Sequence, residues 1–223
     1  LTKMINSVMK QEVDEMKQEI NKAENEVVNE NAGIGMNGHI LIRDKETGEE
    51  LVNKRNAIHY GNMANIVANA LNNQSQSYIH YMAFGNGGTS VDTAGKVIYK
   101  SPRVSESFEA SADLYSRSYN KVISSAAADP TTDKIEVVAG SSFTDLKITC
   151  TLGYAEPSDQ DLFDSSTTNE GSYVFDELAL YSYPTDGSSI TTSKMLTHVV
   201  FHPVQKSQNR IIEIIYTVRI QLS

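Results

Sequence analysis

Tryptophan is absent from this 223-residue sequence, and cysteine occurs only once. A single Cys cannot form an intrachain disulfide, so the fold depends on a hydrophobic core, for which the chain is long enough. No stretch reaches the roughly 18 consecutive apolar residues of a membrane-spanning helix, which argues against membrane insertion. Basic residues are also scarce, with 19 Lys and Arg against 28 Asp and Glu. The formal charge of −9 opposes attraction to a phosphate backbone, so nucleic acid is not expected as a direct partner.

A phosphate-binding loop is the first chemistry to test, on the glycine-rich stretch YMAFGNGGT at residues 81–89. Dinucleotide loops have the pattern GxGxxG before a helix and Walker loops have GxxxxGK[ST], because their glycines turn backbone N–H groups toward phosphate. Counted from Gly85, the sixth position of the first pattern is Ser90, and no Lys follows Gly87 or Gly88 at the required place. We therefore interpret these glycines as a structural loop through which a strand leaves its sheet with positive φ angles.

Two histidines four residues apart, His198 and His202, are candidate metal ligands. The surrounding sequence THVVFHP is typical of a strand, on which this spacing separates the two residues by roughly 13 Å, at about 3.3 Å per residue. They would need a His from elsewhere to hold an ion. Asp159, Asp161 and Asp164 have spacings loosely like those of a calcium loop, but the Gly and the closing Glu of an EF-hand are missing. We interpret them as a solvated acidic loop.

Catalytic constellations are not visible in the sequence. No Ser lies in the G-x-S-x-G turn typical of a Ser-His-Asp hydrolase. Cys150 lies in the alternating run 146–152 without a marked acid or base beside it, which predicts a small buried residue and not a reactive thiol. The sequence therefore predicts a protein that is not an enzyme, with no catalytic residue, metal or cofactor.

Residues 5–30 differ from the rest of the chain because they carry a narrow apolar seam. Apolar side chains recur at spacings of four and three, with polar residues on the other faces: Met9, Val13, Met16, Ile20, Ala23 and Val27. This pattern predicts an N-terminal amphipathic helix over residues 1–31 that serves as an assembly contact. The seam fits a coiled coil with a second copy, and it equally fits a single helix lying on a neighbouring protein or on its own domain.

A glycine-rich joint over residues 32–38 is expected to separate this helix from the main domain. Residues 39–43 and 50–54 then predict a hairpin whose turn places Gly48 in the left-handed conformation. Apolar residues three or four apart predict an amphipathic helix near residues 59–72 that packs one face on a sheet.

From residue 78 onward the chain predicts strand after strand, because runs rich in Val, Ile, Thr and Tyr alternate with turn clusters. The expected strands are 78–84, 96–99, 108–124, 134–138, 143–154, 173–183, 189–201 and 210–222. Crossover helices are missing, which favours antiparallel pairing over a βαβ fold. The sequence thus predicts a mainly β domain over residues 39–223, an antiparallel β-sandwich of jelly-roll type with one packed helix.

The aromatic residues are dominated by Tyr, with eleven Tyr against six Phe. Tyr can bury its ring while its hydroxyl stays hydrated, so this balance is typical of strands at half-exposed or protein-facing surfaces. Together with the narrow seam it favours an assembly subunit.

Three stretches carry a resemblance to a known class of proteins. GHILIRDKETGEELVNKRNAIHYGNMANIVANAL, YMAFGNGGT and LTHVVFHPVQKSQNRIIEIIYTVRIQL resemble virion structural proteins of tailed bacteriophages, over most of residues 38–99 and 173–222. The resemblance implies a subunit of the neck, tail or baseplate, or else a capsid decoration protein. It implies other phage structural proteins as partners and a homo-oligomeric ring.

On this interpretation, Gly85, Gly87 and Gly88 shape a loop at a sheet edge or subunit contact, where another backbone can come close. We also expect residues 5–30 to pack on another chain and not on their own domain. The residues leave two further alternatives open. One is a carbohydrate-binding, adhesin-like sandwich that stacks sugars on Tyr, and the other is an enzyme acting on host polysaccharide.

Overall fold

The structure is a computed structural model that describes residues 33–104, 112–124, 131–154, 156–157 and 172–222. Gly35–Gln221 form one compact unit, and residues 1–34 and 222–223 belong to a separate one. The predicted N-terminal helix and its seam lie outside the described residues, so the structure does not test them.

Nine strands form one continuous sheet in the order β6-β3-β9-β10-β2-β1-β11-β8-β7. They are β1 (Ile34–Asp44), β2 (Glu50–Ile58), β3 (Ile79–Gly85), β6 (Arg117–Val122), β7 (Lys134–Ala139), β8 (Phe143–Leu152), β9 (Ser172–Ser182), β10 (Thr197–Ser207) and β11 (Ile212–Leu222). Every pair whose register is described is antiparallel. A separate hairpin pairs β4 (Thr89–Val91) with β5 (Val97–Tyr99).

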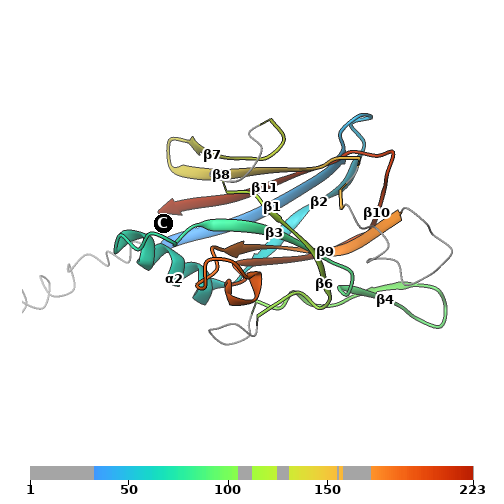
Figure 1. The fold of residues 1–223 in the computed structure, drawn as a ribbon, viewed down its shortest axis with the longest axis horizontal. Helices are drawn as coiled ribbons and strands as arrows, with labels where there is room; N and C mark the ends of the chain where they lie inside the picture. Colours follow the sequence, from blue (N-terminus) through green and yellow to red (C-terminus); the bar gives the residue numbers. More distant parts are fainter. Residues whose placement is uncertain (1–32, 105–111, 125–130, 155, 158–171, 223) are drawn as a thin grey trace, which may run out of the picture. The chain divides into compact units, whose positions relative to one another are not determined.

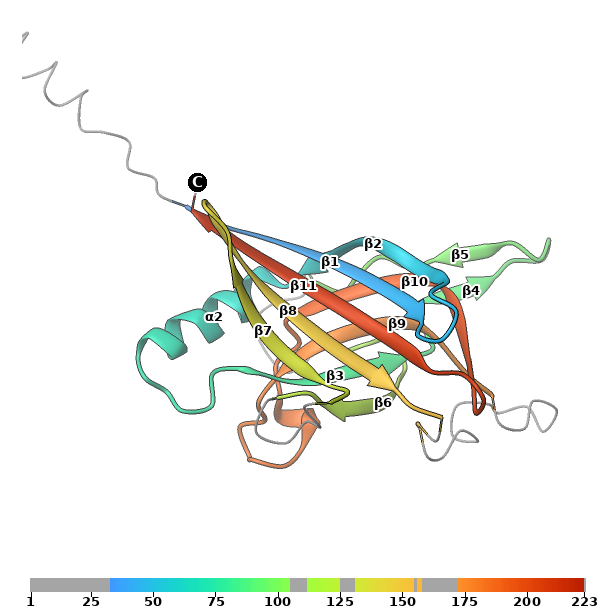
Figure 2. The ribbon, with the colours of Figure 1, turned by 90° about the horizontal axis from the view of Figure 1, so that it is seen from above.

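The sheet curls so that its two halves face each other (Figures 1 and 2). Strands β1, β11, β8 and β7 form one layer, strands β9, β3 and β6 form the other, and β2 and β10 connect them through the sheet. A mainly β, antiparallel fold is therefore confirmed. The predicted sandwich of jelly-roll type is not confirmed, because the two layers are parts of one sheet and not two separate sheets.

The hydrophobic core lies between the two layers. Side chains of a strand alternate between faces, and on β11 the inward positions Ile212, Ile214 and Tyr216 are fully buried. In the opposite layer, the rings of Phe84 on β3 and Phe175 on β9 meet edge to face with their centroids 5.4 Å apart. Fully burying one such side chain contributes about 1.5–3 kcal/mol to the free energy of unfolding, so this core dominates the stability of the domain.

The two edge strands of the sheet are linked by a partly buried ionic cluster. Lys121 on β6 lies 3.0 Å from the carboxylate of Asp133, which precedes β7, and 2.7 Å from the carboxylate of Glu156. Its Nζ also donates to the carbonyl of Thr151 on β8, at 2.6 Å. Asp133 is itself buried and accepts a hydrogen bond from the Thr151 N–H at 2.8 Å. Salt bridges rather than a ladder of backbone hydrogen bonds thus link the edges of the curled sheet.

The predicted helix near residues 59–72 is confirmed as α2 (Tyr60–Leu71). His59 caps its first turn by accepting a hydrogen bond from the Asn62 N–H, and Asn62 in turn donates its side-chain amide to the Met195 carbonyl at 2.8 Å. Met63 enters the core beside them. The first turn of α2 is therefore firmly attached to the sheet.

Three sequence-based boundaries need correction. Residues 34–38 of the predicted joint belong to β1, and Gly38 is required there because a Cβ would overlap the Asn56 side chain on β2. The strand expected over 108–124 is reduced to β6 in the described residues, because the N–H groups of Tyr115 and Ser116 donate to the carboxylate of Glu177 and not to a neighbouring strand.

The strand expected over 189–201 also differs. A short 3₁₀ helix, η2 (Ile190–Thr192), occupies its start, and β10 runs on to Ser207 through Pro203. Pro203 is tolerated because the register of β10 against β9 shifts between Val200 and Val204, which leaves no ladder bond for the missing N–H. The turn after β1 agrees with expectation, since Gly48 has a φ of 76°.

Candidate functional site

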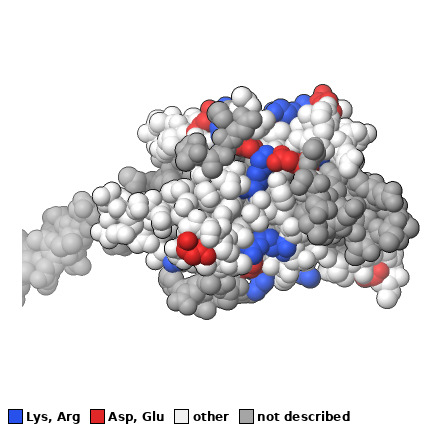
Figure 3. All heavy atoms as spheres, in the orientation of Figure 1, with Lys and Arg blue, Asp and Glu red and all other residues white. Residues whose placement is uncertain are grey.

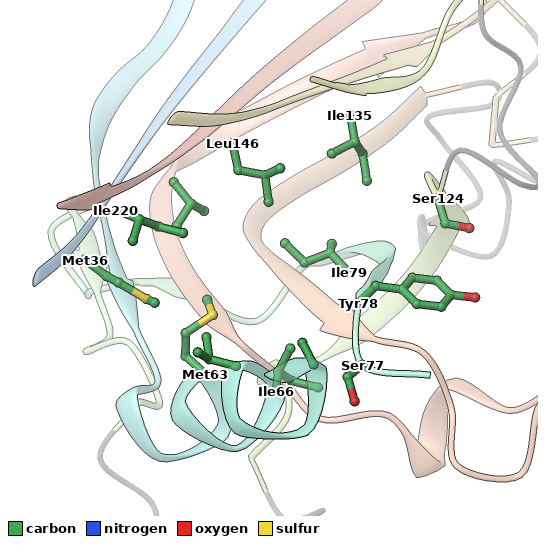
Figure 4. Close-up of a pocket in the computed structure, with 13 residues that line it drawn as sticks. Met36, Met63, Ile66, Ser77, Tyr78, Ile79, Ser124, Ile135, Leu146 and Ile220 are labelled. Carbon is green, nitrogen blue, oxygen red and sulfur yellow. The ribbon is translucent and has the colours of Figure 1, made fainter. Parts of the chain in front are cut away.

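An apolar groove lies beside α2 (Figure 4). It encloses about 630 Å³ between α2 and the inner face of the layer that contains β1, β8 and β11. Its walls are built mainly from Met36, Met63, Ile66, Leu146, Val218 and Ile220. We call this feature the α2 groove.

The groove exists because α2 packs on the core through its first two turns, whereas its C-terminal end is exposed. Met63 is only 6 % exposed, whereas Leu71 at the other end of the helix is 84 % exposed. Ile66 and Val67 lie between these extremes as half-buried wall residues. The sequence predicted an apolar face packed on the sheet, and the second half of that face instead lines an open groove.

One end of the α2 groove is polar. Ser77, Tyr78 and Ser124 contribute hydroxyl groups there, at the right of Figure 4. The Ser124 hydroxyl lies 2.8 Å from Nδ1 of His80, and burial lowers the pKa of that imidazole, which favours its neutral form. The groove is lined by no Asp, Glu, Lys or Arg. It can therefore bind an apolar surface that brings a few neutral hydrogen-bonding groups.

The helix and the chain that follows it carry no formal charge. Residues 56–91 contain no Asp, Glu, Lys or Arg, although charged residues make up 21 % of the whole chain. The surface over α2 is accordingly white in Figure 3. Solvent-facing helices of soluble domains usually carry charged side chains on the outer face, so this composition is typical of a surface that another protein covers.

A carboxylate on β9 holds the glycine loop, residues 85–89, through hydrogen bonds. Asp176 on β9 accepts hydrogen bonds from the N–H groups of Gly88 and Thr89 at 2.9 and 2.7 Å, and from the Thr89 hydroxyl. A Cβ on Gly85 would lie 2.7 Å from the Ser116 carbonyl oxygen, and one on Gly87 would lie 2.8 Å from the Ser116 N. A backbone segment of the same chain, at Ser116, therefore approaches the loop closely at Gly85 and Gly87.

The positive φ angles expected for this loop are wrong. The described glycines with positive φ are Gly48, Gly95 and Gly187, so Gly85, Gly87 and Gly88 are needed for space and not for a left-handed backbone. The loop donates its N–H groups at residues 88 and 89 to Asp176, which leaves those groups unable to bind phosphate.

The two candidate metal ligands on β10 have different environments. His198 is fully buried and hydrogen bonded to Glu177, whereas His202 is exposed and its Nδ1 lies 3.2 Å from the Tyr99 hydroxyl. Within the part of the chain that the structure describes, no three His, Cys, Asp or Glu side chains come together as a metal site. Asp159, Asp161 and Asp164 lie outside that part.

Cys150 is fully buried on β8, as the alternating run predicted. Burial raises the pKa of its thiol, and the nearby Asp133 carboxylate raises it further. Because the thiolate is the reactive form of cysteine, this environment makes Cys150 unreactive.

Sequence reasoning found the residues of α2 but not the groove. The spacing of Met63, Ile66, Val67 and Ala70 marked an apolar face, and a helix of this kind usually packs completely. The overlooked signal was the absence of charge over residues 56–91, which distinguishes a covered helix surface from a hydrated one.

Comparisons of the chain with protein-family models, with curated proteins and with solved structures found no match. Among the described residues, no helix is both long and apolar enough to cross a membrane.

Proposed function

We propose that the chain is a non-enzymatic structural subunit of a tailed phage particle, located in the virion at the neck, tail or baseplate. Its β domain makes protein-protein contacts within a homo-oligomeric ring and with other phage structural proteins. The α2 groove is the observation that carries the proposal, because a wide apolar surface beside an uncharged helix favours contact with another protein. The phage assignment is supported by the three sequence stretches that resemble virion proteins.

The use of the polar residues also supports a structural role. The carboxylate of Asp176 on β9 accepts hydrogen bonds from backbone N–H groups of the glycine loop, and that of Glu177 accepts from the N–H groups of residues 115–116. The ammonium group of Lys121 forms the salt bridges of the ionic cluster between the sheet edges. These charges stabilise loops and edges, and they do not converge on the α2 groove.

Tyr115, one of the exposed Tyr residues, gives the carbohydrate-binding alternative little support. The Tyr115 ring has the Lys100 ammonium 4.5 Å and the Arg103 guanidinium 5.4 Å from its centroid, which compete with a sugar for the ring face. A capsid decoration protein remains the nearest alternative position within the same class of function.

The test is mass spectrometry of purified virions from the phage that encodes the chain. We expect the protein in the particle at a fixed copy number that matches a ring. Absence from intact virions, together with hits for this protein on a glycan array, would support the adhesin instead.

A further inference from the structure

We infer that the α2 groove binds the apolar seam of residues 5–30 from a second copy of this chain. The inference rests on the proposed function and names the partner that the groove receives. The chain then contains both halves of its own assembly contact, an apolar helix stripe and an apolar acceptor groove.

The two halves are alike in their apolar character. The seam presents Met, Val, Ile and Ala side chains on one narrow stripe, which is too narrow to form a core by itself. The α2 groove presents Met36, Ile66 and Ile220 from three separate elements, with no charge among its lining residues. Docking of the seam in the groove would remove both apolar surfaces from water, which contributes about 25 cal/mol of favourable free energy for each Å² of apolar surface buried.

The lengths of the two halves are compatible. From Met9 to Val27 a helix would rise about 27 Å, at roughly 1.5 Å per residue. The twelve residues of α2 span about 18 Å on the same scale. A helix lying alongside α2 would therefore place about two heptads of the seam in the groove and leave one turn at each end outside.

The rim of the groove suits the polar flanks of the segment. A second depression shares Ile66 and Ser77 with the α2 groove and is lined by the amides of Asn65, Asn69 and Gln74. Lys194 also lies there, and its Nζ donates to the Asn65 side chain at 2.8 Å. Residues 5–30 contain seven acidic residues and three Lys, so their carboxylates can accept hydrogen bonds from the amide and ammonium groups of this rim.

The second copy is chosen because the proposed ring requires a contact between copies. Residues 31–33 connect the segment to Ile34, where β1 begins, and Met36 two residues later lines the groove. In a ring, a helix of 26 residues would reach about 39 Å, which is long enough to cross to the groove of a neighbouring copy.

Disulfide trapping tests the inference, because the native Cys150 is buried and does not compete. One full-length variant carries Ile20→Cys in the seam, and a second, distinguished by a mass tag, carries Ala70→Cys in the groove. Ala70 is exposed at the groove wall, so the fold tolerates the change. The matched control is Ala68→Cys, which is exposed on the same helix but does not line the groove.

We expect mild oxidation of the mixture to form a mixed dimer at least tenfold more efficiently with Ala70→Cys than with Ala68→Cys. A chain carrying both Ile20→Cys and Ala70→Cys that closes on itself as a monomer would overturn the exchange between copies. Dimers linked only between two Ile20→Cys chains would show that the seams pair with each other, which also contradicts the inference. Both of these outcomes leave the proposed function standing, whereas absence of the protein from virions would refute that function.

Discussion

Glu177 and His198 form a fully buried pair in which the carboxylate lies 3.0 Å from Nε2 of the imidazole. The Arg103 N–H donates to Nδ1 of His198 at 2.8 Å, so Nδ1 carries no proton and Nε2 is the donor to Glu177. The same carboxylate accepts from the N–H groups of Tyr115 and Ser116 at 2.9 and 2.8 Å. The pair thus fastens two loop segments to β9 and β10, which is a structural role.

Removing the imidazole should destabilise the domain strongly. His198→Ala removes one of the three donors to the buried Glu177 carboxylate, and we expect a loss of about 3 kcal/mol in the free energy of unfolding. Urea denaturation measures the loss. His202→Ala on the same strand is the control, because that side chain is exposed and its removal should cost less than about 0.5 kcal/mol. Equal effects of the two substitutions would contradict the structural role of the pair.

Crowding at the glycine loop makes a second prediction. Gly85→Ala places a methyl group against the Ser116 carbonyl and the Glu177 side chain, so we expect a loss of about 1–3 kcal/mol and a lower midpoint of thermal unfolding. Gly153→Ala is the matched control, because its nearest neighbour would be the Glu156 carboxylate at 4.0 Å. A loss of stability as large at residue 153 as at residue 85 would show that close approach is not what requires glycine in the loop.

The turn after β1 should give a pH-dependent signal. Backbone hydrogen bonds, that from Thr47 foremost, and the Arg210 guanidinium 2.7 Å away hold the pKa of Asp44 at about 2, below its usual 3.8. Because the unfolded chain binds the proton more readily, Asp44 stabilises the fold fully above about pH 4 and loses this effect as the pH falls toward 2.

We expect Asp44→Asn to flatten the decline of the unfolding free energy between about pH 4 and pH 2. Urea denaturation at a series of pH values measures it. An unchanged acid slope in the variant would mean that Asp44 is not held in its charged form by the turn.

The ionic cluster between β6 and β7 predicts a local effect. Lys121→Met removes the cation that lies beside both Asp133 and Glu156, and it leaves the Asp133 carboxylate buried without that partner. We expect amide hydrogen exchange to accelerate at least tenfold in β6 and β7, while β9 and β10 in the middle of the sheet stay protected. Uniform acceleration of exchange over all strands would show that the cluster does not act locally between the two edge strands.

Local sequence patterns predicted most elements of this fold. The spacing of Met63, Ile66 and Val67 predicted α2, and the turn residues around Gly48 predicted the first hairpin, because both depend on neighbours within a few residues. The joining of all nine strands into one sheet was not predictable in this way. It depends on which strands pair across long separations, such as β2 with β10.

The candidate site was only partly predictable for the same reason. The sequence marked a special loop at Gly85, Gly87 and Gly88. Their need for space arises from residues distant in the chain, namely Ser116 for the first two glycines and Val200 for Gly88. The α2 groove depends on how far the second half of a helix stands from a sheet, and an apolar face has the same pattern whether it is fully packed or left open.

Sedimentation of the full-length chain tests the central claim that the α2 groove is an assembly surface. We expect species larger than the 24.6 kDa monomer that dissociate in the Ala70→Glu variant, because a charge in the apolar groove opposes docking. Ala68→Glu, on the outer face of the same helix, should leave the assembly intact. A monomer at every concentration, or an assembly unaffected by Ala70→Glu, would contradict the claim.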